Sequence, residues 1–168
     1  MFGKLLTLIL LLTNQSVTDT SPPKKISLPQ QLILINLTTK TLEFYDQDKL
    51  VFECSVRIGK RGTPTPLGIG FVYEKRDRPI FRYVDPGPQQ GQVVNYAECG
   101  DGLKKVIHSK MRALGLNMKG EIKYSIHSTT CSETIGKPLS NGCIGMTVPD
   151  MLKLYPLVKE GTKVRIVK

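Results

Sequence analysis

Short runs of apolar residues, separated by polar turns, make up most of the chain after residue 31. These runs are rich in β-branched and aromatic residues, and the turns between them are polar and short. The runs long enough for a strand are residues 32–36, 41–45, 50–58, 69–73, 124–127 and 164–167. Because such closely spaced strands usually pair with their sequence neighbours, the pattern predicts an antiparallel meander at the start of a mainly β fold.

One short helical pattern interrupts the succession of strands. The apolar residues between 151 and 155 form one face, with Pro149 and Asp150 suited to the first helical turn. Pro156 ends or kinks this helix. Residues 104–116 are compatible with either a short helix or a strand. The predicted fold class is therefore a mainly β sandwich or meander with one or two short helices.

The first twenty residues have the pattern of a targeting segment. Lys4 is followed by an apolar run over residues 5–12, which Thr7 alone interrupts. This run is too short for a bilayer, which needs roughly 20 residues, so residues 1–20 are interpreted as a signal peptide or N-terminal anchor. A buried strand or helix is the alternative. Residues 21–31, rich in proline, serine and lysine, are predicted to be a linker, and 32–168 a single domain.

Length and charge narrow the functional classes. The chain of 168 residues has a formal net charge of +10, which suggests an acidic partner such as nucleic acid, an anionic membrane or a carboxylate-rich polymer. Nucleic-acid binding is disfavoured, because no helix-turn-helix pattern, zinc-ligand spacing or RNA-binding aromatic motif is evident and the leader indicates export. Residues 74–103 are basic and irregular, and we interpret them as a lid over a cleft or as a solvated excursion.

The residues suited to catalysis gather between positions 125 and 146. This stretch holds one of the two histidines, His127, and two of the four cysteines, of which Cys143 follows a glycine turn. A thiol with a pKa near ~8.5 becomes a nucleophile when an imidazole removes its proton. Gly142 allows a tight turn, so the N–H groups of Asn141, Gly142 and Cys143 are candidate oxyanion donors. The alternative for such a cysteine is a buried structural role.

Two further motifs flank this stretch in a fixed order. They read Gly59-Lys60-Arg61-Gly62-Thr63-Pro64-Thr65-Pro66-Leu67-Gly68 upstream and Glu160-Gly161-Thr162-Lys163-Val164 downstream. With His127-Ser128 and Ser140-Asn141-Gly142-Cys143-Ile144-Gly145, they resemble the L,D-transpeptidase catalytic domains of the YkuD type. The resemblance extends from about residue 32 to residue 168.

This resemblance implies a site and an activity. It makes Cys143 the nucleophile, His127 the base and the carbonyl of Ser128 its orienting group. We assign substrate contacts to Ser140, Thr63 and Thr65. The implied reaction is peptidoglycan L,D-transpeptidation, in which a cysteine acyl-enzyme leads to a 3→3 cross-link. L,D-carboxypeptidation and catalytically silent peptidoglycan binding are the alternatives.

The resemblance also implies the setting of the protein. Its partners would be peptidoglycan stem peptides, without nucleic acid, and the protein would be a monomer. No metal or organic cofactor is implied. The leader adds the expected location, which is the periplasm or cell envelope after export across the inner membrane, with anchoring by the N-terminus as the alternative to cleavage.

Two positions depart from the family signature. Asn141 stands where the family usually has histidine, and Gly145 where it usually has arginine or asparagine. The first change removes no proton carrier, since His127 remains. The second removes a side chain that helps to order the pocket.

The remaining cysteines allow two disulfide hypotheses. An oxidising envelope favours pairing of Cys54 with Cys99. Pairing of Cys131 with Cys143 would instead switch the nucleophile off. The choice depends on side-chain geometry that the sequence does not contain.

Overall fold

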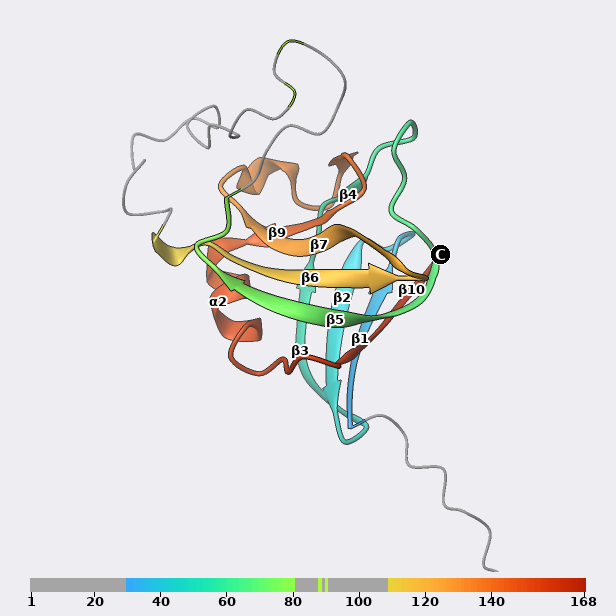
Figure 1. Ribbon diagram of the computed structural model, residues 1–168, viewed down its shortest axis with the longest axis vertical. Helices are drawn as coiled ribbons and strands as arrows, with labels where there is room; N and C mark the ends of the chain where they lie inside the picture. Colours follow the sequence, from blue (N-terminus) through green and yellow to red (C-terminus); the bar gives the residue numbers. More distant parts are fainter. Residues whose placement is uncertain (1–29, 81–87, 89, 91–108) are drawn as a thin grey trace, which may run out of the picture.

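The computed structural model describes residues 30–80, 88, 90 and 109–168 (Figure 1). The predicted leader, nearly all of the predicted linker and most of the proposed lid lie outside these residues. Within the described part of the chain, no helix is long and apolar enough to cross a membrane.

Strands dominate the described residues, which confirms the mainly β prediction. Their bounds are β1 (Gln31–Asn36), β2 (Thr41–Asp46), β3 (Lys49–Ser55), β4 (Ile58–Gly59), β5 (Gly68–Asp77), β6 (Arg112–Met118), β7 (Glu121–Thr129), β8 (Pro138–Ser140), β9 (Ile144–Thr147) and β10 (Lys163–Val167). One eight-stranded sheet has the order β3-β2-β1-β10-β5-β6-β7-β9, and β4 pairs with β8 in a second, two-stranded sheet.

The predicted meander is correct for the first three strands, while other pairs in the sheet run parallel. β1, β2 and β3 pair antiparallel in sequence order. However, β10 lies parallel to β1, and β9 lies parallel to β7. Parallel strands need a long connection, which residues 130–143 provide between β7 and β9. The third strand, predicted over residues 50–58, is shorter in the structure. β3 ends at Ser55, and Ile58 belongs to β4, which pairs with β8.

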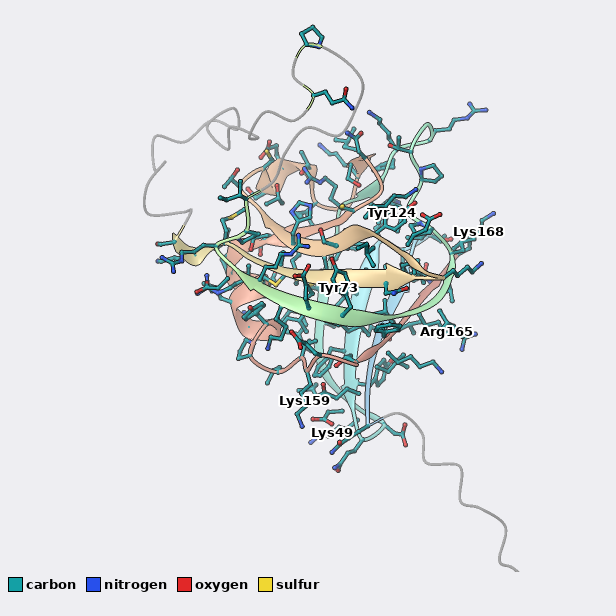
Figure 2. All side chains as sticks on the ribbon, viewed as in Figure 1. Lys49, Tyr73, Tyr124, Lys159, Arg165 and Lys168 are labelled. Carbon is teal, nitrogen blue, oxygen red and sulfur yellow. The ribbon has the colours of Figure 1, made fainter. Side chains whose placement is uncertain are left out.

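Basic side chains are widely distributed on the surface of the sheet. Lys49 lies at the start of β3, Lys159 lies before β10, and Arg165 lies on β10 itself (Figure 2). All three are exposed. The positive charge inferred from composition is therefore not confined to the segment interpreted as a lid.

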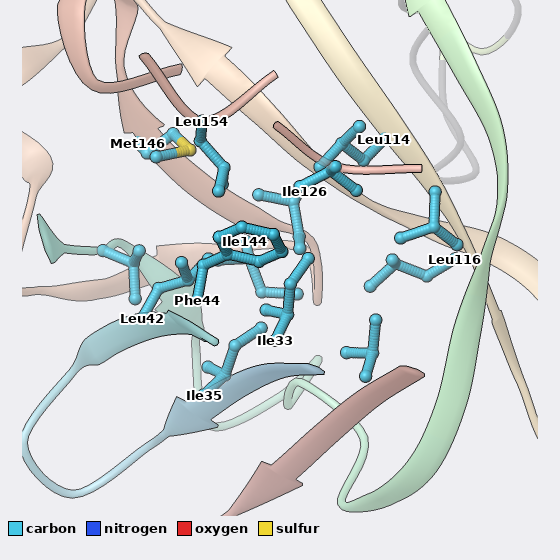
Figure 3. Packing of buried hydrophobic residues seen from close by; sticks show 14 of the residues in the cluster. Ile33, Ile35, Leu42, Phe44, Leu114, Leu116, Ile126, Ile144, Met146 and Leu154 are labelled. Atoms are coloured by element: carbon cyan, nitrogen blue, oxygen red, sulfur yellow. The ribbon is translucent and has the colours of Figure 1, made fainter. Parts of the chain in front are cut away.

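A hydrophobic core shared by distant strands explains why the sheet curves in the described part of the chain. Alternate residues point inward, among them Ile33 and Phe44 from β1 and β2, and Ile126 and Ile144 from β7 and β9 (Figure 3). β2 and β9 lie near opposite ends of the strand order, yet their side chains belong to the same buried cluster. The two ends of the sheet must therefore face each other, which gives the sandwich-like shape and packs β7 and β9 against the core.

The predicted helix is present as α2 (Val148–Leu154). The Thr147 hydroxyl accepts a hydrogen bond from the Asp150 N–H at 3.2 Å, and Pro149 lies in the first turn. Met151 and Leu154 are buried. Helix α2 thus begins directly at the end of β9 and covers the core beside it.

β5 continues into the segment that the sequence indicated to be irregular. Residues 74–77 belong to this strand. Lys75, expected to supply charge to a lid, instead donates hydrogen bonds to the carbonyls of Tyr155 at 2.8 Å and Val158 at 2.7 Å. A cation is favourable there because carbonyls at a helix C-terminus lack intrahelical partners. The irregular-segment interpretation is wrong for these residues.

Replacing one buried aromatic ring tests the core. Phe44 is 1% exposed, so Phe44→Ala should lower the free energy of unfolding by about 3–5 kcal/mol through lost burial and a cavity. Phe71→Ala on β5 is the matched control, because its ring is 44% exposed and its loss should cost under about 1 kcal/mol. Urea denaturation followed by circular dichroism measures both. Equal losses would contradict the assignment of the core.

Candidate active site

His127 lies on β7, the strand next to the edge strand β9, and has a neighbouring strand on each side. It lies opposite Ala113 on β6 and Gly145 on β9, so small residues flank the ring. Its Nδ1 lies 2.9 Å from the carbonyl oxygen of Ser128. Because a carbonyl only accepts, Nδ1–H is the donor and Nε2 is left with a lone pair. This tautomer is the one that a base requires.

Ser128 is itself held firmly, which fixes the carbonyl that orients His127. Its side chain is fully buried, and its hydroxyl donates to the Arg112 carbonyl at 3.2 Å and accepts from the Arg112 N–H at 3.0 Å. The predicted orienting contact is therefore present, and β6 supports it.

The protonation of His127 is shifted toward the neutral form. Burial is the main reason that its pKa falls from 6.5 to about 4, and the positive charge of Arg57 acts in the same direction. The hydrogen bond to Ser128 opposes this shift. As a whole residue, His127 is only partly buried. At neutral pH the imidazole is uncharged and able to accept a proton.

Cys143 comes to the same face of the sheet as His127. It is a free, half-buried thiol immediately before β9, and Ser125 Oγ donates a hydrogen bond to its Sγ at 3.6 Å. Ser125 and His127 are two residues apart on β7, so their side chains project from one face. Sequence reasoning missed Ser125, although the same alternation along the strand identifies it as a neighbour of the site.

A tight turn positions Cys143. Ser140 Oγ donates to the Cys143 carbonyl at 2.5 Å and accepts from the Gly142 N–H at 3.2 Å. Gly142 has φ +102°, and a Cβ there would lie 3.0 Å from the Tyr124 ring. The turn therefore requires glycine. Of the three predicted oxyanion donors, the Gly142 N–H is already bonded, and the prediction remains for Asn141 and Cys143.

The Thr-Pro loop lies against this turn. Thr63 Oγ1 donates to the Ser140 carbonyl at 3.3 Å and lies 3.5 Å from Asn141 Oδ1. Thr65 is buried, and its hydroxyl accepts a hydrogen bond from the Gly59 N–H at 2.8 Å. Both threonines and Ser140 thus support the loop and the turn, while their predicted contacts with substrate stay predictions.

Arg57 is a further residue of the site that sequence reasoning missed. Its N–H and C=O exchange hydrogen bonds with Gly145 at 2.7 and 2.9 Å. A Cβ on Gly145 would lie 2.9 Å from Arg57 Nε, so the guanidinium fills the space of the missing side chain. The signal in the sequence was the glycine itself, since a vacated position in a packed site must be filled by another group.

Both disulfide hypotheses are wrong. Cys54 and Cys143 are free, whereas Cys131 is disulfide-bonded, and neither of these two is its partner. Cys54 lies on β3 and packs against the core, where burial raises the pKa of its thiol to about 12. Cys54 is therefore an inert thiol, and Cys143 is available.

Comparisons with known proteins agree on one family. A family model described as the L,D-transpeptidase catalytic domain, YkuD, matches residues 30–166. A Bacillus licheniformis protein named as an L,D-transpeptidase (YkuD) is 31% identical over 134 residues, covering 80% of this chain and 64% of the relative. An Escherichia coli K12 protein named as an L,D-transpeptidase (ErfK/SrfK) is 29% identical over 157 residues, which cover 85% of this chain and 49% of the relative. The chain thus spans about half to two thirds of the length of these relatives.

Solved structures give the same answer for the fold. The crystal structure of an Enterococcus faecium L,D-transpeptidase mutant superposes with a TM-score of 0.62 at 22% identity. The superposition covers 82% of this chain and 49% of the Enterococcus faecium chain. At this identity the likeness concerns the fold alone.

The lowered pKa of His127 predicts how stability depends on pH. Between pH 6.5 and about 4 the unfolded chain binds a proton at His127 and the folded chain does not, so acidification favours unfolding. The contribution is fully present above pH 6.5 and is lost as the pH falls to about 4. Urea unfolding at several pH values measures this contribution as the difference in the free energy of unfolding between wild type and His127→Gln. A difference that does not change over this range would contradict the shift.

Proposed function

Because the chain belongs to the L,D-transpeptidase catalytic domain family, we propose that it forms 3→3 cross-links in peptidoglycan through an acyl-enzyme on Cys143. The observation that carries this proposal is the arrangement around β7, where Ser125 bonds the free thiol of Cys143 and the oriented, neutral His127 lies two residues further along the same face of the strand. A nucleophile, a base and an orienting group are the set that acyl transfer requires.

The first half-reaction transfers an acyl group to sulfur. Cys143 Sγ attacks the carbonyl carbon of the third stem residue, while His127 Nε2 takes the thiol proton. The tetrahedral oxyanion lies toward the turn, where the N–H groups of Asn141 and Cys143 are its proposed donors. When the intermediate collapses, the C–N bond breaks and His127 returns the proton to the leaving amine of the terminal D-residue. A thioester remains on Cys143.

The second half-reaction resolves this thioester. The side-chain amine of a neighbouring stem attacks the thioester carbonyl and loses a proton to His127, and the thiol regains it on release. A water molecule in the same position would give L,D-carboxypeptidation instead. The lowered pKa of His127 keeps the imidazole neutral before each half-reaction and makes the transient imidazolium a ready proton donor to the leaving group.

Substrate binding is proposed for the loop and turn beside the nucleophile. Thr63 is the best placed of the three predicted substrate residues, because it is partly exposed and already contacts Ser140 and Asn141. Ser140 and Thr65 are buried, so their influence on substrate would pass through the turn and the loop. A net charge of +10 suits stem peptides, which carry carboxylates.

The wider organisation follows from the same proposal. Residues 32–168 would be the catalytic domain, carried into the periplasm or cell envelope by residues 1–20 and separated from them by the linker at 21–31. Peptidoglycan there would be the partner. In this reading the protein acts as a monomer.

Incubation with disaccharide-tetrapeptides, with products identified by mass, tests the reaction. Wild type should release the terminal D-alanine and form a cross-linked dimer, and Cys143→Ala should form neither while keeping its fold. His127→Ala should reduce the rate by several orders of magnitude. Cys54→Ala is the matched control, since it removes the other free thiol and should leave the rate unchanged.

Each alternative has its own outcome in this assay. Release of D-alanine without a dimer would identify a carboxypeptidase. Binding of the peptide without turnover would identify a silent binding protein. Turnover by folded Cys143→Ala would exclude the acyl-enzyme altogether.

A further inference from the structure

A cationic side chain is fixed beside the proposed nucleophile by the backbone. Arg57 forms an isolated antiparallel bridge with Gly145, and their two hydrogen bonds, 2.7 and 2.9 Å long, are reciprocal. Gly145 is two residues after Cys143 and lies directly opposite His127 on β7. The backbone of Arg57 therefore has a defined place relative to both reacting side chains.

The guanidinium lies over the glycine. A Cβ on Gly145 would come within 2.9 Å of Arg57 Nε, 3.2 Å of Nη2 and 3.3 Å of Cζ. These three distances show that the planar group covers the position that a side chain of Gly145 would occupy. This is the face that His127 shares, because directly paired residues of neighbouring strands project to the same side.

The charge of this guanidinium has no carboxylate partner within ion-pair distance in the described residues. Nη1 donates to the Thr134 hydroxyl at 3.4 Å, and the buried Nε has no hydrogen-bond partner there. Burial lowers the pKa of Arg57, whereas its interactions with Cys143 and then Glu133 raise it. The guanidinium therefore lies over Gly145, two residues from Cys143, without a carboxylate partner in the described residues.

We propose that Arg57 is a positioning residue that stabilises the thiolate of Cys143 and disfavours the imidazolium form of His127, a role that rests on the function proposed above. A neighbouring opposite charge typically favours an ionised group by roughly 10- to 1,000-fold. The same cation opposes protonation of His127, whose neutral form is needed to accept the thiol proton. One fixed charge thus favours the ionised form of the sulfur and keeps the resting imidazole neutral.

This role also accounts for the glycine at position 145. The family signature usually has a polar or basic side chain there, whereas this chain brings a guanidinium to the same place from the segment between β3 and β4. Any side chain at Gly145 would displace it. Arg57 and Gly145 are therefore complementary.

Alkylation of Cys143 by iodoacetamide tests the proposal in a Cys54→Ala background. Arg57→Gln should slow alkylation at pH 7 by about 10-fold and move the pH profile of the rate to higher pH, because thiolate is the reacting form. Arg57→Lys should keep most of the rate. Arg165→Gln on β10, three strands from β7, is the matched control and should change nothing. Iodoacetamide needs no peptide, so the test stands even if transpeptidation is not observed.

A second variant moves the guanidinium without removing its charge. Gly145→Ala should slow alkylation in the same direction as Arg57→Gln, because the new Cβ displaces Nε. Circular dichroism verifies the fold of each variant, and if Arg57→Gln does not fold, Gly145→Ala decides. Wild-type alkylation at every pH in the folded variants would overturn the proposal. A raised KM for tetrapeptide with unchanged alkylation would also overturn it, and would assign Arg57 to a substrate carboxylate.

Discussion

The parallel pairing of β7 with β9 is the constraint on which the candidate site depends. This register sets His127 opposite Gly145 and brings Cys143, just before β9, beside Ser125. Both strands contribute side chains to the core, so sliding one strand past the other would expose buried residues such as Ile126 and Ile144. The hydrophobic core thereby fixes the relation between an imidazole and a sulfur that are sixteen positions apart in sequence.

Burying the charge of Arg57 is unfavourable, and more than one neighbouring residue offsets this. Arg57 loses hydration on burial, and Thr134 offers it only a long hydrogen bond. Such a cation is tolerated where an anion forms near it. Our account assigns that anion to Cys143 and makes Gly145 the residue whose small size leaves room for the guanidinium. The Arg57 guanidinium then both packs over Gly145 and favours the thiolate of Cys143.

Local patterns in the sequence were sufficient for the first two strands and for α2, but they did not identify β8 and β9. Alternating apolar residues located β1 and β2 to within a residue or two, and Pro149 with Asp150 marked the first turn of the helix. Long-range relations were not accessible. The parallel pairs, the cap that Lys75 gives to α2 and the place of Arg57 all depend on how distant segments meet in space.

The central claim is that Cys143 and His127 are neighbours, and histidine-selective ¹⁵N spectra test it most directly. In a Cys54→Ala background, Cys143 is converted to a mixed methyl disulfide, and the nitrogen resonances of His127 are compared before and after. Our account predicts an Nδ1–H tautomer in the free protein and a clear change at Nε2 on modification. An Nε2 resonance that does not change when the sulfur is blocked would contradict it.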